Sequence, residues 1–350
     1  MSIQASETDI LGCQFEEWYD YFENDTLKSK IIHLDSEFMK YLTADGVYLP
    51  NNVKQSEKDY ISDDEGIIPI EQSDSNEGVD FKMAPDIIEP ILSALRQSQR
   101  GLFIKLNWSA PTDASWLFGN SVRCRVIDDV LLLLKSSDRI VFDIEHMFKN
   151  CVGSSRTGPD RFTLVLRNWA DLNPSMEFRV FVRNKTIVGI SQRICSIYFS
   201  FLRTERERLS SLIFTFFQNK VREKFSLTSY ALDLYIDRKQ RVWIIDFNPF
   251  GDPTNALLFE WSELIALSNN ELKRVDDEAG EGSDEGELDE FFRVVASDQD
   301  TLPDASGSYR GPIDVHLSQD FPKFMDICKQ QQNDSANDEA VDGIIGREIS

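Results

Sequence analysis

Residues 242–251 read Val-Trp-Ile-Ile-Asp-Phe-Asn-Pro-Phe-Gly, an apolar strand that carries Asp246 and Asn248 near its end. Successive side chains of a strand point to opposite faces, so Asp246 and Asn248 share one face and Phe247 lies on the other. Asp and Asn are both depleted in strands, which indicates a role other than packing. Their oxygens suit Mg2+, whose usual substrate is a phosphate. Alternatively, both residues only end the strand and begin a turn, which the following proline and glycine also favour.

The segment just before this strand strengthens the prediction of a metal site. Residues 230–236 form a second predicted strand, and residues 237–240 form a polar turn between the two strands. In the resulting antiparallel hairpin, a four-residue loop places Asp233 diagonal to Asp246, and a two-residue loop places it directly opposite. Either even number brings three oxygen ligands onto one face. An odd number would send Asp233 to the other face.

Lys105 lies inside the apolar predicted strand of residues 101–106. Burying a long cation there is costly unless a counter-charge meets it, and a triphosphate is one such counter-charge. The alternative is a lysine on an edge strand whose amino group reaches the solvent. The turn that follows contains Trp108 and Ala110, which could line an adenine pocket, although a Trp in such a turn also suits a core position.

Further charged residues lie in the predicted strands of the second half of the chain, among them Arg167, Glu177, Arg179 and Arg193. Glu177 and Arg179 share a face because strand side chains repeat every two residues. Contacts to phosphates explain them, and so does an internal Glu–Arg ion pair. Whether Arg193 joins that face depends on the hairpin register, which the sequence leaves open.

Composition limits the class of protein. The 350 residues are 41% hydrophobic, which is enough for a sizeable core. The longest apolar stretches fall far short of the roughly 20 residues that a membrane span needs, and the first residues match neither a secretory signal nor a transit peptide. The five cysteines are widely spaced and odd in number, which is typical of reduced thiols in a cytoplasmic protein. With three histidines, the sequence offers few ligands for a zinc site and few candidates for a His-based triad.

The formal net charge of -23 opposes binding to nucleic acid and to anionic membranes, because affinity for phosphates comes from clusters of Lys and Arg. We therefore expect no nucleic-acid or membrane partner, and a basic protein surface is the natural partner. Much of the acidity lies in residues 56–80 and 276–290, which we expect to be solvated loops.

Periodicity predicts an α+β fold with largely antiparallel sheets. Two short segments stay ambiguous: residues 130–134 and 140–142 fit either two strands or a strand followed by a helix. The other predicted helices are 15–21, 36–42, 86–97, 205–225 and 260–269, and the other predicted strands are 29–34, 101–106, 162–169, 177–182 and 186–193.

Several long motifs carry a resemblance to a known family. They are KLNWSAPTDASW (105–116), LLLKSSD (132–138), LVLRNWADLNPSMEFRVFV (164–182), ISQR (190–193) and VWIIDFNPFG (242–251). In this order they resemble the cell division cycle protein 123 family. Residues 13–49 look like the family's N-terminal segment and residues 292–318 like its closing segment, so the resemblance covers most of residues 13–318.

The resemblance implies an ATP-grasp-like fold in which two lobes of largely antiparallel sheet, with helices around them, form a nucleotide cleft for ATP and Mg2+. The lobes would span residues 13–165 and 166–318, followed by a polar tail over 319–350. The implied function is that of an assembly chaperone for eukaryotic translation initiation factor 2. It would bind the gamma subunit of that factor as a cytoplasmic monomer and support translation initiation and cell cycle progression.

The family's site residues transfer to this sequence position by position. Asp233, Asp246 and Asn248 match the magnesium ligands, and Lys105 matches the phosphate-contacting lysine. The turn beside the nucleotide corresponds to Trp108, Ser109 and Ala110. Arg167 and Trp169 match the segment that links the lobes near the base, and the charged positions around the phosphates correspond to Glu177, Arg179 and Arg193.

Two functions remain open for such a cleft. In a binding protein, ATP and Mg2+ close the lobes and order a surface that captures the partner, so no catalytic residue is needed. In an ATP-dependent carboxylate-amine ligase of the ATP-grasp type, the same cleft would form an acyl phosphate and pass it to an amine. A ligase also requires a pocket for the acceptor, and no residues of the sequence point to one.

Overall fold

A computed structural model of the chain describes residues 3–47, 49–50, 52–53, 81–151, 155–274 and 291–303. The predicted acidic loops, 56–80 and 276–290, and the predicted tail, 319–350, lie outside the described residues. The predicted closing segment of the fold, 292–318, is described only as far as residue 303.

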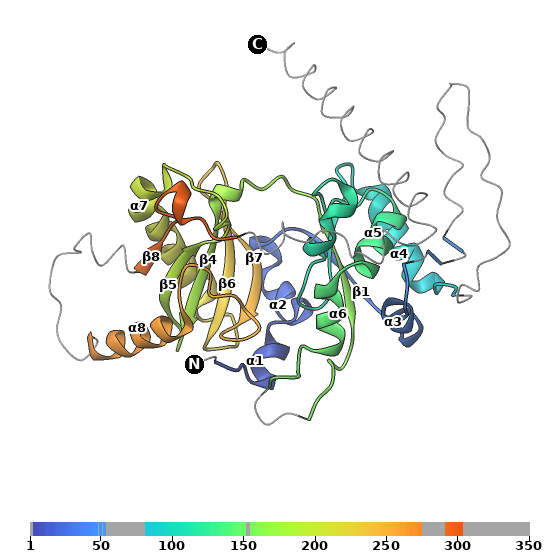
Figure 1. Cartoon of the computed structure of the whole chain (residues 1–350), viewed down its shortest axis with the longest axis horizontal. Coiled ribbons are helices and arrows are strands. Elements are labelled where there is room, and N and C mark those ends of the chain that lie inside the picture. Colours follow the sequence, from blue (N-terminus) through green and yellow to red (C-terminus); the bar gives the residue numbers. More distant parts are fainter. Residues whose placement is uncertain are drawn as a thin grey trace, which may run out of the picture.

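Two β-sheets form the centres of two lobes (Figure 1). The N-terminal lobe has three antiparallel strands in the order β1-β3-β2, and the C-terminal lobe has five in the order β7-β6-β4-β5-β8, all antiparallel except β5 and β8. The predicted α+β fold with largely antiparallel sheets is confirmed. The strands are β1 (Ser29–His33), β2 (Leu102–Lys105), β3 (Thr163–Asn168), β4 (Glu177–Arg183), β5 (Thr186–Gln192), β6 (Tyr230–Ile236), β7 (Val242–Pro249) and β8 (Phe292–Arg293).

Helices cover both sheets. They are α1 (Glu7–Gly12), α2 (Phe15–Phe22), α3 (Ser36–Thr43), α4 (Pro85–Gln97), α5 (Ile127–Lys135), α6 (Asp138–Glu145), α7 (Leu202–Phe216) and α8 (Trp261–Arg274), with short 3₁₀ turns between them, such as Thr112–Phe118. Within the described ranges, no helix combines the length and the apolar character that crossing a membrane demands.

The small sheet of the N-terminal lobe has two different faces. Ile32, Ile104 and Leu166 point into a core that the lobe's own helices complete. Because side chains alternate, Lys105 and Arg167 occupy the opposite face, toward the C-terminal lobe. The strand of the larger sheet nearest to them is β7, which lies at the edge of that sheet (Figure 1).

The first helices of the chain pack with the C-terminal lobe. Phe15, Trp18 and Phe22 of α2 belong to the core that also contains Phe247 of β7 and Phe225. Residues 13–25, which the sequence groups with the N-terminal lobe, therefore share the core of the larger sheet, and α1 and α2 lie between the two lobes in Figure 1.

Residues 130–134 and 140–142 are helical, so the prediction of strands there, or of a strand and a helix, is wrong. Both helices have clear start signals, because the Asp129 carboxylate accepts the backbone N–H groups of Arg125 and Val126, and the Ser137 hydroxyl accepts that of Ile140. The run of four leucines hides the helical period because α5 is buried on every side.

The ring of Phe247 packs against three aromatic rings, and its centroid lies 4.0 Å from that of Phe225, 5.2 Å from that of Trp18 and 5.4 Å from that of Phe22. Phe247→Ala should lower the free energy of unfolding by about 3–5 kcal/mol, because the cavity would lie where α2 meets the larger sheet. Urea unfolding followed by circular dichroism measures this. Tyr21→Ala, at a side chain of α2 that is 66% exposed, should change it by less than about 0.5 kcal/mol. Similar losses for both variants would contradict this account of the core.

Candidate functional site

The hairpin β6–β7 places Asp233 directly opposite Asp246 by a route that the sequence did not predict. Its loop, 237–241, has five residues, one more than the predicted turn 237–240, and is therefore the odd case that the sequence left open. A bulge at Ile245 adds one residue to β7 and restores the register, so that Asp233 and Asp246 share a face despite the odd loop. Asn248 lies on the same face, and its Nδ2 donates to Asp233 Oδ2 at 3.4 Å. The three predicted metal ligands therefore do come together.

Two rows of side chains cross this face of the larger sheet. The first row consists of Asp246, Asp233, Arg179 and Ser191, each opposite the next. The second consists of Trp243, Tyr235 and Glu177, and the backbone N–H of Arg193 donates to the carbonyl of Glu177 at 2.9 Å. Arg193 therefore joins the face of Glu177 and Arg179, which answers the question of register that the sequence left open.

Asp233 is held by two arginines. Arg179 Nε and Nη2 donate to its two oxygens, each at 2.7 Å, and Arg193 Nε lies 3.4 Å from Oδ2. Burial alone would raise the pKa of Asp233, but Arg179 and Arg193 outweigh burial and hold that pKa below its usual value. Among the described residues, Arg179 thus forms its ion pair with Asp233, whereas the sequence suggested Glu177 as its partner.

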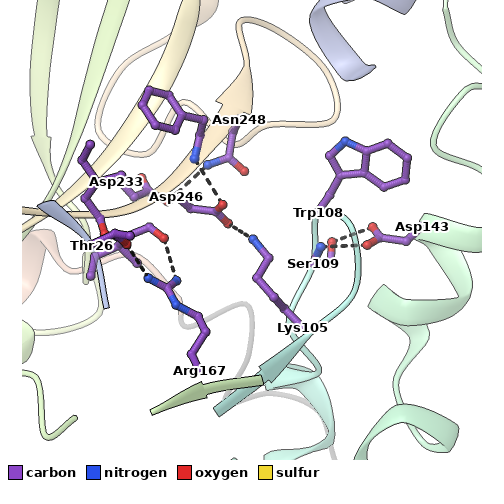
Figure 2. A network of polar contacts seen from close by, with 12 residues as sticks. Thr26, Lys105, Trp108, Ser109, Asp143, Arg167, Asp233, Asp246 and Asn248 are labelled. Carbon is purple, nitrogen blue, oxygen red and sulfur yellow. Dashed lines mark hydrogen bonds and ion pairs between the residues drawn. The ribbon is translucent and has the colours of Figure 1, made fainter. Parts of the chain in front are cut away.

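Lys105 joins the two lobes. Its Nζ donates to Asp246 Oδ2 at 2.6 Å, as Figure 2 shows. Although β2 is an edge strand, the side chain is only 2% exposed, so the alternative of a solvent-reaching lysine is wrong. Burial lowers the pKa of Lys105 and raises that of Asp246, and in each case the partner's charge opposes the effect of burial.

Arg167 of β3 is a second link between the lobes. Its Nη1 donates to the Ile245 carbonyl at 2.7 Å and its Nη2 to the Thr26 hydroxyl at 2.9 Å. The Thr26 hydroxyl in turn donates to the Ile244 carbonyl at 2.7 Å. Burial lowers the pKa of Arg167 to about 10, so it stays charged at neutral pH. Its Nε is buried and has no hydrogen-bond partner among the described residues.

The turn after Lys105 is fixed by buried hydrogen bonds. Trp108 lies in the core, where its Nε1 donates to the Ile10 carbonyl at 2.8 Å, and the structure does not bring it to the charged cluster. The backbone N–H and the hydroxyl of Ser109 both donate to Asp143, each at 2.7 Å (Figure 2). Ala110 is half-buried. A direct role of these three turn residues in nucleotide binding stays a prediction.

Asp143 is a site-supporting residue that sequence reasoning missed. It lies on α6, is 1% exposed and anchors the turn that positions Lys105. Burial raises its pKa to about 6, which the hydrogen bonds from Ser109 partly oppose. No local signal marks it, because its partner lies 34 residues away in the sequence.

A pocket of about 400 Å3 lies beside the bulge. It contains the predicted site residue Trp169, whose Nε1 donates to Asp171 Oδ1 at 2.7 Å. Its other lining residues are Leu27, Arg100, Ala170, Asp171, Leu172, Tyr235, Trp243 and Ile245. A more open hollow of about 730 Å3, near Arg156, shares no lining residue with it and contains no member of the charged cluster.

The cluster has the chemistry of an anion site with room for a hard cation. Lys105, Arg167, Arg179 and Arg193 supply positive charge, and two aspartates and one amide supply oxygens. Within the described part of the chain, Asp246 Oδ1 accepts one hydrogen bond, from the backbone N–H of Phe247 at 3.1 Å. The described ranges contain no group of three or more His, Cys, Asp or Glu placed to hold a metal. One or two carboxylates fit Mg2+ when phosphate oxygens complete its shell, so the residues present fit magnesium together with a polyphosphate.

Known proteins are similar to this chain in sequence and in fold. Residues 18–319 match the D123 family model. The translation initiation factor eIF2 assembly protein of Xenopus tropicalis is 31% identical over 337 residues, which cover 94% of this chain and 98% of that protein. The Kluyveromyces lactis protein of the same description is 36% identical over 76% of this chain and 79% of its own length. The solved structure of Cdc123 from Schizosaccharomyces pombe superposes with a TM-score of 0.62 at 31% identity, covering 76% of this chain and 94% of that one.

The raised pKa of Asp143 should make the free energy of unfolding depend on pH. Its folded pKa, about 6, lies above the ordinary value near 4, so the folded state holds a proton that the unfolded state releases in this range. As pH rises from 4 to 7, the free energy of unfolding of the wild type should fall by roughly 2–3 kcal/mol relative to Asp143→Asn, with the two curves parallel above pH 7. Urea titrations at several pH values measure this, and curves that stay parallel throughout would contradict it.

Proposed function

The chain belongs to the D123 family, and on that premise we propose that it binds ATP and Mg2+ and acts as an assembly chaperone for eukaryotic translation initiation factor 2. Its partner in this proposal is the gamma subunit of that factor, and its place of action is the cytoplasm. One observation carries the nucleotide part of the proposal: a single strand, β7, borders both an aromatic pocket, through Trp243 and Ile245, and the charged cluster, through Asp246 and Asn248.

The order of residues along β7 suits the two ends of a nucleotide. Trp169, Tyr235 and Trp243 offer flat aromatic surface for a base, since rings stack well on aromatic side chains. The bulge puts Asp246 next to that pocket, so phosphates of a bound nucleotide would reach the cations within a short distance.

Each part of the nucleotide and its metal has residues that would hold it. Lys105, Arg167, Arg179 and Arg193 would contact phosphates, because cations in a water-poor site bind oxyanions strongly. Asp233, Asp246 and Asn248 would ligate Mg2+, which neutralises phosphate charge when bound.

The charge of the cluster favours a magnesium–nucleotide complex. The four cations outnumber the two aspartates, and Glu177, whose pKa burial raises to about 7, adds a carboxyl that is only partly ionised. The residual charge is positive, and the magnesium complex of ATP is a dianion. A neutral base or nucleoside would lack the charge that the cluster matches.

The way the cluster is built supports the proposed coupling between nucleotide and partner. Lys105 and Arg167 come from the N-terminal lobe, and Asp246 and Arg179 from the C-terminal lobe. A ligand that contacts both pairs has its highest affinity for one arrangement of the lobes. That difference in affinity is sufficient to couple nucleotide binding to partner capture, without any catalytic residue.

The metal site is tested by Asp246→Asn. This change keeps the shape of the side chain and an acceptor for Lys105, but it removes the anionic metal ligand. The affinity for ATP in the presence of Mg2+, measured by calorimetry, should fall at least about 100-fold, or about 2.7 kcal/mol. Asp20→Asn removes an exposed carboxylate of α2 and should leave that affinity unchanged. Equal affinities in the two variants would refute the site.

The partner is tested with purified gamma subunit of eukaryotic translation initiation factor 2. Capture by the full chain should increase several-fold when ATP and Mg2+ are added, and Asp246→Asn should lose this increase. Capture should also weaken with salt, because the chain's charge of -23 favours a basic partner surface. Capture that depends neither on nucleotide nor on salt concentration would point to an apolar contact unrelated to the cleft.

A further inference from the structure

The carboxylate that the proposed metal site needs is already bound by a cation of the protein. Lys105 Nζ lies 2.6 Å from Asp246 Oδ2, which is a hydrogen-bonded ion pair. The ammonium is almost completely buried, so leaving it without an anion would be costly. A divalent cation and Lys105 therefore compete for the same oxygen.

We propose that Lys105 determines the specificity of this site by blocking Asp246 against free divalent cations until a polyphosphate offers the ammonium another anion. The inference rests on the proposed function, because it concerns the same cleft. It adds an order of binding: Asp246 becomes available to a metal only when Lys105 has phosphate oxygens to bind.

The two aspartates differ in how firmly their cations are held. Arg179 contacts Asp233 through two nitrogens and also donates to the Asn255 carbonyl at 2.8 Å, which fixes the guanidinium on its own sheet. Among the described residues, the ammonium of Lys105 donates one hydrogen bond, from a flexible stem on the opposite lobe. The Lys105 contact is therefore the one that can be exchanged, and the Arg179 pair is the one that remains.

Other cations near Asp246 do not occupy its oxygens. Arg167 lies close enough to influence the charge of Asp246, but its hydrogen bonds go to Ile245 and Thr26. Arg193 lies beside Asp233 at 3.4 Å and is about one-third exposed. Within the described part of the chain, Asp246 forms its ion pair with Lys105. Removing Lys105 should thus have an effect that removing another cation of the cleft does not.

The test uses Mn2+ as the probe metal and follows its free signal by electron paramagnetic resonance, without nucleotide. Lys105→Gln should bind Mn2+ at least 10-fold more tightly than the wild type. In calorimetry, the same variant should bind the Mn2+ complex of ATP at least 10-fold more weakly, since a phosphate contact is lost. Lys30→Gln is the matched control: it removes one positive charge from the other face of the same small sheet, where Lys30 is exposed, and should raise the affinity for free Mn2+ by less than 3-fold.

Two further variants secure the interpretation. Lys105→Gln combined with Asp246→Asn should lose the gain in Mn2+ affinity, which assigns the gain to Asp246. Lys105→Met, which fills a similar volume, should behave like Lys105→Gln, and thermal unfolding establishes that each variant is folded.

The outcomes separate a failure of the blocking role from a failure of the proposed function. Unchanged Mn2+ affinity in folded Lys105→Gln and Lys105→Met, or an equal gain in Lys30→Gln, would overturn the inference and leave the proposed function intact. If the wild type itself failed to bind the Mn2+ complex of ATP, the proposed function would fail instead. A rise in free Mn2+ affinity with a fall in affinity for the ATP complex supports the blocking role, because a lysine that only contacted phosphate would change the second quantity alone.

Discussion

The bulge at Ile245 is the constraint on which the arrangement of the site depends. It turns an odd hairpin loop into a register in which Asp233 and Asp246 oppose each other across two strands. It also sets Ile245 and Asp246 side by side, so that the pocket and the charged cluster share one strand. The carbonyl of Ile245 meanwhile accepts Arg167 from the other lobe. One extra residue in an edge strand thus fixes the positions of the two aspartates, the pocket and a contact between the lobes.

Buried charge is tolerated here because each carboxylate meets a cation. An isolated buried ion would lose several kcal/mol of hydration, and the two pairs recover much of that through short hydrogen bonds. Such pairs contribute little net stability compared with apolar packing, which the aromatic cluster around Phe247 supplies on the other face of the sheet. The two faces of the larger sheet therefore have different roles. The face toward α2 stabilises the fold, and the opposite face carries charges that suit a ligand.

How far the sequence could predict this site depends on the range of each interaction. The shared face of Asp246 and Asn248 was predictable because it follows from the geometry of a single strand, and Lys105 was conspicuous as a cation in an apolar strand. The bulge was not predictable, since it depends on how β7 fits both β6 and the opposite lobe. Asp143 was hidden because its partner is distant in sequence, and the helix α5 was hidden because burial on all sides removes its period.

Two of the polar contacts between the lobes, those of Arg167 and Lys105, would respond differently to a ligand. Arg167 binds a backbone carbonyl and a hydroxyl, neither of which a phosphate or a metal would take from it. Lys105 binds a carboxylate that a metal would claim. A change of partner at Lys105 would therefore leave the Arg167 contact in place, together with the apolar contacts of Trp108, Phe148 and Val165 in the core that the lobes share. Because β7 is bonded within its sheet to β6 alone, the loss of the Lys105 contact would act first on the β6–β7 hairpin.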